Sequence, residues 1–135
     1  MAIELRGQRI LLRPLKLTDA EAIYRHARHR EISRYTYIPH PYQRDHADQF
    51  INMTQVWLKK GVARHFGIEW KKTREVIGVI GLFDMDMRNK RTEIGYWLGK
   101  KYWGMGIASE AVSLVVDYCF KTIKLHRVYA HVFTG

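Results

Sequence analysis

Cysteine, acidic residues and long apolar runs are the scarce features of this sequence. A single cysteine, Cys119, excludes an internal disulfide and fits a reducing compartment. No apolar run approaches the roughly 20 residues of a membrane-spanning helix. The first residues also lack the basic-then-apolar pattern of a signal peptide. We therefore expect a cytoplasmic protein.

The shortage of acidic residues leaves a strong positive charge. Lys and Arg number 23 against 13 Asp and Glu, so the formal net charge is +10. Such an excess suggests an anionic partner, which could be nucleic acid, a membrane surface or a phosphorylated cofactor. Charge for solubility alone is an equally good explanation. The 135 residues, 47% of them hydrophobic, suit one ordered domain over 1–135 that removes about two-thirds of its unfolded-chain surface from water.

The most informative stretch is a strand, a glycine turn and a helix in immediate succession. The strand is predicted over Thr92–Leu98, the turn over Lys101–Gly106, and the helix from Ile107. Glycines let the backbone turn sharply and approach a ligand closely. The first helical turn then offers unpaired N–H groups and the positive end of the helix dipole. This order predicts a site for an anionic group such as phosphate.

Two common phosphate loops do not match this turn. The dinucleotide fingerprint needs a third glycine, and Ser109 stands in its place. A nucleotide-triphosphate loop needs Gly-Lys followed by Ser or Thr, whereas Gly106 is followed by Ile107. Cys119 continues the apolar i+4 series of the helix, which favours a core residue over a nucleophile.

The residues of this stretch resemble a known cofactor motif. The segments are Glu93-Ile94-Gly95-Tyr96-Trp97-Leu98-Gly99 and Tyr102-Trp103-Gly104-Met105-Gly106-Ile107-Ala108-Ser109-Glu110-Ala111. They resemble the acetyl-coenzyme A motif of the GNAT superfamily of N-acetyltransferases, most closely the branch of ribosomal-protein N-terminal acetyltransferases. The signature of that superfamily is Gln/Arg-x-x-Gly-x-Gly/Ala. It is matched at Gly104 and Gly106, while Lys101 occupies the first position.

The remaining chain predicts a mixed α+β fold. A capping box at Thr18 and Glu21 indicates a helix to about Arg28. Asp45 is the expected N-cap of a second helix, which Gly61 ends. Strands are expected over Gln8–Lys16, Val62–Lys71, Glu75–Met85, Thr92–Leu98 and Arg127–Thr134, with a long helix over Ile107–Lys124. The order β-α-α-β-β-β-α-β resembles the GNAT fold, which implies a twisted, mostly antiparallel sheet with helices on both faces.

The last predicted strand, Arg127–Thr134, is apolar on both faces. Such a strand belongs in the covered interior of a sheet, whereas exposed edges usually carry charges or proline. In the resembling family a further helix and two strands follow at this point. We therefore expect either a fragment of a longer polypeptide, lacking the C-terminal helix and strands, or a homodimer in which a second copy covers this edge.

The resemblance assigns the cofactor contacts. The pantetheine arm and thioester oxygen of acetyl-CoA are expected at the backbone of a strand bulge, and Gly95 predicts such an irregularity. The pyrophosphate is expected at the turn, with a cation supplied by Lys101. The implied contacts are Tyr96, Trp97 and Leu98 for pantetheine, and Trp103, Gly104, Met105, Gly106, Ile107 and Ala108 for pyrophosphate.

Catalysis needs a base for the ammonium of the acceptor. Glu93 is the best candidate, although a surface ion pair with Arg91 or Lys90 explains it equally well. His40 and Tyr42 lie in a proline-bounded loop that lines the acceptor side in the family, and packing is again an equal alternative. The general acid of the family follows the last predicted strand, so none is assigned. The seven histidines lack metal-ligand spacing, and no metal is expected.

The leading hypothesis is an enzyme that transfers an acetyl group from acetyl-CoA directly to a primary amine, such as a protein N-terminus or a small amine, within a ternary complex. An inactive or truncated acyl-CoA-binding module is the second reading. A basic nucleic-acid-binding domain ranks last because the aromatic residues follow core patterns. A membrane partner is not expected.

Overall fold

One six-stranded sheet organises the chain. In the computed structural model, which describes residues 3–28 and 42–130, the strand order is β1-β2-β3-β4-β5-β6. The strands are β1 (Leu5–Arg6), β2 (Ile10–Arg13), β3 (Arg64–Trp70), β4 (Glu75–Asp86), β5 (Arg91–Leu98) and β6 (Arg127–Ala130). Each neighbouring pair is antiparallel except β5 and β6, which are parallel. The predicted β3-β4-β5 meander is confirmed.

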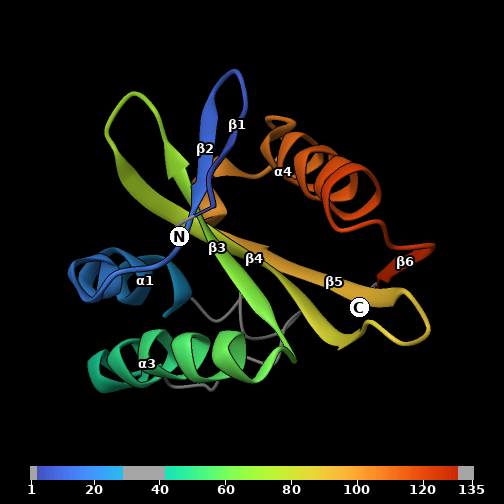
Figure 1. Cartoon of the computed structure of the whole chain (residues 1–135). Coiled ribbons are helices and arrows are strands. Elements are labelled where there is room, and N and C mark those ends of the chain that lie inside the picture. Colours follow the sequence, from blue (N-terminus) through green and yellow to red (C-terminus); the bar gives the residue numbers. More distant parts are fainter. Residues whose placement is uncertain (1–2, 29–41, 131–135) are drawn as a thin grey trace.

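Helices cover both faces of this sheet, as predicted (Figure 1). α1 (Ala20–Ala27) packs on β4 and α3 (Arg44–Lys60) on β3, whereas α4 (Ile107–Asp117) contacts β1, β2 and β5. Short 3-10 helices, η1 (Leu17–Asp19) and η2 (Lys100–Tyr102), precede α1 and α4. One π-helical turn, η3 (Tyr118–Thr122), replaces the end of the helix predicted to Lys124.

The first predicted strand, Gln8–Lys16, is confirmed as β2, with the narrower bounds Ile10–Arg13. A short strand that was not predicted, β1, precedes it and forms a hairpin with it, in which Leu5 pairs with Leu12 and Arg6 with Leu11. The Gly7 N–H donates to the Ile10 carbonyl at 2.9 Å, which closes the turn. The hairpin was missed because a two-residue strand carries too little alternation to be read from the sequence. The element order therefore begins β-β-α rather than β-α.

The predicted capping box at Thr18 and Glu21 is wrong. The Asp19 carboxylate accepts the Lys16 N–H at 2.8 Å, so Lys16 is the N-cap and the helical segment begins two residues earlier than expected, as η1. Arg13 donates to both carboxylate oxygens of Asp19 at 2.9 Å, and both side chains are buried. This pair, formed across the start of the helix, fixes where the chain leaves β2.

The second helix starts one residue before the expected cap. Gln43 is its N-cap in place of Asp45, and the Gln43 N–H donates to His46 Nδ1 at 2.9 Å. The predicted end is confirmed, because Gly61 has a left-handed φ of 73° and closes the helix with its N–H.

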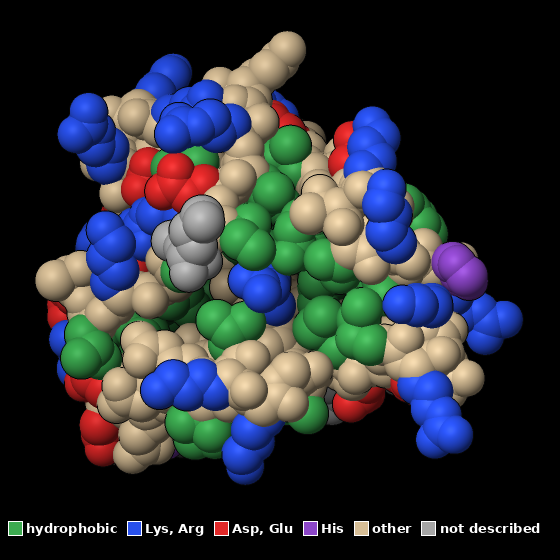
Figure 2. Space-filling view, in the orientation of Figure 1, with side chains coloured by type: hydrophobic (Ala, Val, Ile, Leu, Met, Phe, Trp, Pro, Cys, Tyr) green, Lys and Arg blue, Asp and Glu red, His purple; other side chains and the backbone are tan. Residues whose placement is uncertain are grey.

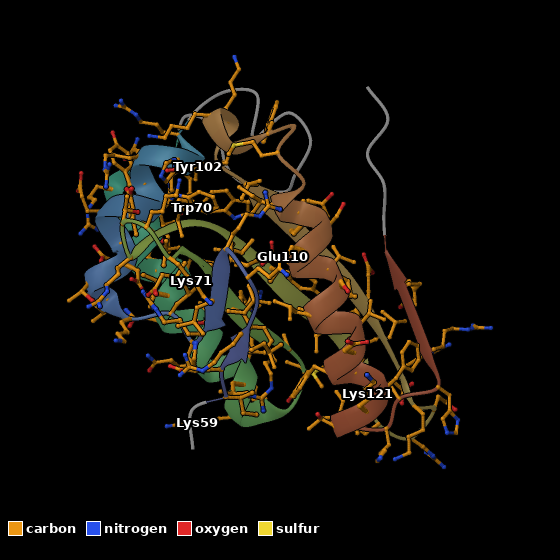
Figure 3. All side chains as sticks on the ribbon, turned by 90° about the horizontal axis from the view of Figure 1, so that it is seen from above. Lys59, Trp70, Lys71, Tyr102, Glu110 and Lys121 are labelled. Atoms are coloured by element: carbon orange, nitrogen blue, oxygen red, sulfur yellow. The ribbon has the colours of Figure 1, made fainter. Side chains whose placement is uncertain are left out.

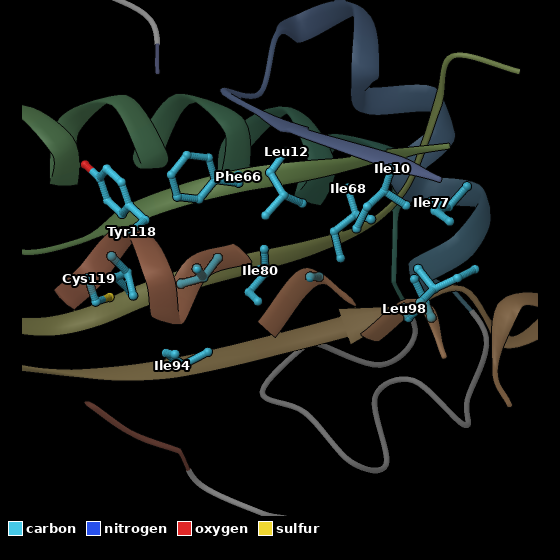
Figure 4. Close-up of a cluster of buried hydrophobic side chains, with 14 of the residues drawn as sticks. Ile10, Leu12, Phe66, Ile68, Ile77, Ile80, Ile94, Leu98, Tyr118 and Cys119 are labelled. Carbon is cyan, nitrogen blue, oxygen red and sulfur yellow. The ribbon is translucent and has the colours of Figure 1, made fainter. Parts of the chain in front are cut away.

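The sheet lies between two apolar clusters, one on each of its faces. The larger lies between the sheet and α4, and Figure 4 shows Ile68, Ile80 and Ile94 from β3, β4 and β5 within it, together with Tyr118 and Cys119. The smaller lies under α1 and α3, and its members are Leu15, Ala20, Ile23, Ala27, Tyr42, Ala47, Ile51, Val76 and Val79. Because side chains alternate along β5, Ile94 and Leu98 face α4 whereas Glu93 and Trp97 face α1 and α3.

Candidate active site

The C-terminal half of β5 has a backbone edge with which no described strand pairs, here called the open edge. The Gly99 N–H donates to the Ile77 carbonyl at 2.8 Å, so Gly99 belongs to the residues that bond β4. Because antiparallel bonding alternates along a strand, the N–H groups of Tyr96 and Leu98 point away from β4. β6 pairs with β5 only over Arg91–Ile94 in the described chain. These two amides therefore face an edge that no described strand covers.

The same alternation limits the contacts predicted on this strand. The Trp97 N–H is directed toward β4, so its expected pantetheine contact cannot use this amide. The Leu98 side chain is buried in the core at 5% exposure, and only its backbone is available. The Tyr96 side chain is 49% exposed and stands beside the open edge.

The irregularity predicted at Gly95 is wrong. Pairing with β4 runs without interruption from Gly78–Leu98 to Phe83–Glu93, and the register shifts only between Phe83 and Asp86. Gly95 has another reason to be glycine: a Cβ there would lie 2.8 Å from the Phe83 ring. The described part of β6 pairs with β5 only up to Ile94, so no described strand lies along the rest of this edge.

The turn after β5 has the backbone geometry expected of a phosphate loop. Gly104 and Gly106 have φ of 76° and 78°, a region that favours glycine. A Cβ at Gly104 would meet nothing within 4 Å, so the loop is open on that side. Gly106 is the N-cap of α4, and the first helical bond joins the Glu110 N–H to its carbonyl at 3.2 Å. The amides of Ile107, Ala108 and Ser109 thus have no partner within the helix.

Trp103 links the loop to the strand. Its indole N–H donates to the Leu98 carbonyl at 2.7 Å, which occupies the outward carbonyl at the end of β5. Its side chain is 42% exposed and that of Met105 45% exposed, while Ile107 is fully buried and can contribute only its backbone. Ala108 is partly buried in the first turn of α4. The loop therefore offers amides framed by exposed apolar side chains.

Arg9 and Glu110 hold this loop, and sequence reasoning missed both roles. Arg9 donates from Nη1 to the Met105 carbonyl at 2.6 Å and from Nε to Glu110 at 3.0 Å. Its backbone N–H donates to the other Glu110 oxygen at 3.0 Å. Figure 3 shows Glu110 on the side of α4 that meets the β1–β2 hairpin. Partial burial opposes ionisation of Glu110, but the bonds from Arg9 lower its pKa.

This clamp fixes one peptide plane. In a trans peptide the C=O and the following N–H point in opposite directions. Because Arg9 holds the Met105 carbonyl, the Gly106 N–H must point away from Arg9, toward the open side of the loop. Arg9 and Glu110 are 101 residues apart, so no local pattern in the sequence could reveal the contact.

The predicted base, the predicted acceptor contacts and Lys101 lie in different parts of the structure. Glu93 is half-buried on the α1 and α3 face and is paired in register with Phe83. Tyr42 is 9% exposed within the smaller cluster, and burial, with Asp48, raises its pKa to about 12. Tyr42 therefore packs in the core under α1 and α3, and its contact with a substrate stays a prediction. Lys101 is exposed, with Nζ 5.2 Å from the centroid of the Tyr102 ring. His40 lies outside the described residues.

Cys119 is a core residue, as predicted. It is fully buried, and burial raises the pKa of its thiol to about 11. Across 3–28 and 42–130 there is no group of three or more His, Cys, Asp or Glu placed to hold a metal ion. The helices in these ranges are also too short or too polar to cross a membrane.

Comparison with known proteins identifies the family. The sequence profile of the acetyltransferase (GNAT) domain matches residues 9–135. The chain belongs to the GNAT acetyltransferase family. It is 38% identical over 125 residues to the uncharacterized N-acetyltransferase p20 of Bacillus licheniformis, covering 93% of this chain and 70% of that protein. Over 69 residues it is 36% identical to the ribosomal-protein-serine acetyltransferase of Escherichia coli K12, covering 51% and 37% of the two chains.

Solved structures share the GNAT fold. A probable acetyltransferase superposes with a TM-score of 0.87 at 22% identity, covering 98% of this chain and 76% of the other. RimJ of Mycobacterium smegmatis, in complex with CoA-disulfide, superposes with a TM-score of 0.80 at 23% identity, covering 97% and 66%. The predicted GNAT family, the fold class and an acetyltransferase activity are confirmed. The ribosomal-protein branch has similarity over part of the chain in its favour and stays a prediction.

Proposed function

We propose that this GNAT acetyltransferase moves the acetyl group of acetyl-CoA directly to a primary amine in a ternary complex. One observation carries the proposal. The open edge of β5 runs directly into the Gly104–Gly106 loop and the free amides of α4. A strand edge suits an extended amide-containing arm, because it offers backbone hydrogen bonds. A helix N-terminus suits a pyrophosphate. The two sites are adjacent and in the order that the cosubstrate requires.

The residues fit acetyl-CoA in the following way. The amides of Tyr96 and Leu98 would bind the pantetheine arm, and those of Gly104 to Ala108 the pyrophosphate. The exposed side chains of Tyr96, Trp103 and Met105 would cover apolar parts of the arm. Lys101 adds positive charge beside the loop. Since these contacts are mostly backbone, they need a fixed loop more than particular side chains, which is the role of Arg9 and Glu110.

The transfer requires three events. The amine nitrogen, after losing a proton, attacks the thioester carbonyl carbon and forms an N–C bond. The C–S bond then breaks, the nitrogen gives up its second proton to form the neutral amide, and the departing thiolate takes up one proton. Glu93 would accept the proton of the ammonium, directly or through water. Its side chain lies on the face of β5 opposite α4, so an acceptor under α1 and α3 could reach the strand edge from that side.

The acceptor class follows from the relatives. Relatives named ribosomal-protein-serine acetyltransferase and spermidine N(1)-acetyltransferase indicate a protein N-terminus or a small amine. Both acceptors carry a primary amine, whose protonated form must lose a proton near neutral pH. The proposed compartment is the cytoplasm, which a single free cysteine also suits.

A thiol-release assay tests the proposal. Purified protein is mixed with acetyl-CoA and a panel of peptide N-termini and polyamines, and free thiol is measured. We expect acceptor-dependent thiol release and a mass increase of one acetyl group on the acceptor. Stabilisation by coenzyme A without thiol release for any acceptor would instead support the inactive binding module.

A further inference from the structure

A basic cavity lies beside the phosphate loop, on the side of α1. Its volume is about 220 Å³, and the described residues that line it are Arg25, His26, Arg28, Lys100 and Lys101. Three come from the end of α1 and two from η2, the segment that leads into the Gly104–Gly106 loop. Each of these five side chains is a cation or can become one.

Two of these cations are held in place without an acidic partner. The Arg28 guanidinium lies 5.7 Å from the centroid of the Tyr24 ring, and Lys101 Nζ lies 5.2 Å from that of Tyr102. The described residues place no carboxylate within ion-pair distance of either group. Arg25, in contrast, pairs with Glu75. As far as the described residues go, Arg28 and Lys101 therefore leave positive charge available for an external anion.

His26 adds a buried polar group to the cavity. Its side chain is 11% exposed, and within the described chain its Nε2 makes no hydrogen bond, with Glu75 at 3.5 Å. Burial lowers its pKa, and Arg25 and Lys101 lower it further, while Glu75 opposes them. An anion in the cavity would offset the charges of the two cations, Arg25 and Lys101, that face His26.

We propose that this cavity binds a phosphomonoester dianion. The proposal rests on the acetyl-CoA function above, because coenzyme A carries one such group, its 3′-phosphate. The cavity and the pyrophosphate loop share η2, so one nucleotide could reach both. A phosphate delivered separately, free or on an acceptor, has the same chemistry and is the second possible source.

A second cavity flanks the loop on its other side and makes a direct comparison possible. It measures about 310 Å³ and is lined by Gln8, Arg9, Trp70, Lys71, Lys72 and Met105. Two of its three cations are bonded within the protein: Arg9 bonds Glu110 and Met105, and Lys71 donates to the Gly7 carbonyl at 2.6 Å, which leaves Lys72. This difference favours the α1 side for the phosphate.

The test measures the affinities of coenzyme A and of dephospho-coenzyme A, which lacks the 3′-phosphate, for the full chain by calorimetry. Variants of equal charge change are Arg28→Gln in the basic cavity, Lys72→Gln in the second cavity and Arg88→Gln. Arg88 is exposed in the β4–β5 turn, at the far end of β5. We expect Arg28→Gln to weaken coenzyme A about five- to tenfold, as for loss of a charge-assisted hydrogen bond, and to leave dephospho-coenzyme A unchanged. The other two variants should weaken both ligands equally or not at all.

Other results separate the alternatives. Thermal stabilisation by inorganic phosphate that Arg28→Gln removes, with no preference for coenzyme A over its dephospho form, supports the cavity with a separate phosphate as its ligand. Selective loss in Lys72→Gln, or no selective loss and no phosphate effect, overturns the proposal. If neither coenzyme binds the wild type, the proposed function fails, and the phosphate measurement alone decides the cavity.

Discussion

At the scale of the residue, the clamp made by Arg9 is the feature with the clearest functional consequence. It acts on the loop through one carbonyl and one carboxylate and need not touch the reacting atoms. Arg9→Gln removes the ion pair with Glu110 and frees the Met105 peptide. We expect the KM for acetyl-CoA to rise about three- to tenfold, with kcat and the acceptor KM little changed.

Steady-state kinetics with each substrate varied in turn measure this effect, and Arg6→Gln is the control. Arg6 is exposed on β1, and within the described part of the chain its one ion pair is with Glu4, two positions earlier. A fall in kcat at unchanged KM for acetyl-CoA would contradict a role in positioning the loop.

The proposed role of Glu93 as a base is tested by Glu93→Gln, which keeps the shape of the side chain and removes its charge. Glu93→Gln should lower kcat about a hundredfold, the usual size of a general-base effect, and flatten the acid limb of the pH–rate profile. Affinity for coenzyme A should stay nearly unchanged, because the expected cofactor contacts are backbone groups further along the strand. A loss of activity under about threefold would assign Glu93 a surface role instead.

His65 predicts a pH dependence of stability. It is buried among Phe50, Trp57 and Phe83, and neither ring nitrogen has a partner among the described residues. Burial lowers its pKa from 6.5 to about 4. Between these values the unfolded chain binds the proton more readily, so stability is complete above pH 6.5 and falls as the pH drops toward 4.

The loss from His65 amounts to about 3 kcal/mol across that window. Urea unfolding at a series of pH values measures it. His65→Leu should flatten the slope, whatever its effect on stability at neutral pH, and the exposed His126→Gln should leave it intact. An unchanged slope in His65→Leu would show that this histidine does not cause the pH dependence of stability.

At the scale of the element, the glycine loop can be compared with another glycine of the same conformation. Gly106 and Gly61 have φ of 78° and 73°, and each flanks a helix. Alanine at either position should lower the free energy of unfolding by roughly 1–2 kcal/mol, the cost of a left-handed conformation. Only Gly106→Ala should also weaken coenzyme A, by about tenfold, because loop amides lose their direction.

Melting temperatures with and without coenzyme A separate the two effects. Gly61→Ala, at the end of α3, should start from a lower melting temperature but gain the normal increment from the ligand. Equal increments in the two variants would mean that the loop does not hold the cofactor.

Elements that depend on local pattern were predicted well, and those that depend on distant partners were not. The meander, the Gly61 stop and the glycine loop follow from alternation and from backbone freedom near each residue. The start of α1 depends on Arg13 taking the Asp19 carboxylate, and Gly95 depends on a ring from the neighbouring strand. Arg9 and Glu110 illustrate the limit most clearly, because each sits in an ordinary local context and the contact exists only in three dimensions.

At the scale of the whole molecule, charge and the edge of the sheet matter most. Figure 2 shows Lys and Arg side chains distributed around one face, with hydrophobic side chains gathered nearer its middle. The net charge of +10 favours binding of a polyanionic cosubstrate and makes its affinity sensitive to salt. The net charge does not determine which acceptor is used, because acceptor choice depends on the few residues that line the acceptor site.

The open side of β6 gives a prediction about assembly. Val128 packs partly on the core, but Tyr129 is 38% exposed, and no described strand pairs beyond β6. Unpaired strand edges with apolar side chains favour association. We expect a second copy to cover this edge, giving twice the chain mass of 16.0 kDa in light scattering. A chain-sized mass at every concentration would exclude the homodimer.

The ion pair between Arg9 and Glu110 also bears on the order in which the parts of the protein fold. Closing a contact between residues 101 apart costs more chain entropy than closing a hairpin, and contacts of high sequence separation form slowly. The meander and the helices can form from local contacts, but the direction of the Gly106 amide is set only when the N-terminal hairpin has docked on α4. During folding, the capacity to bind coenzyme A should therefore mature after most of the secondary structure.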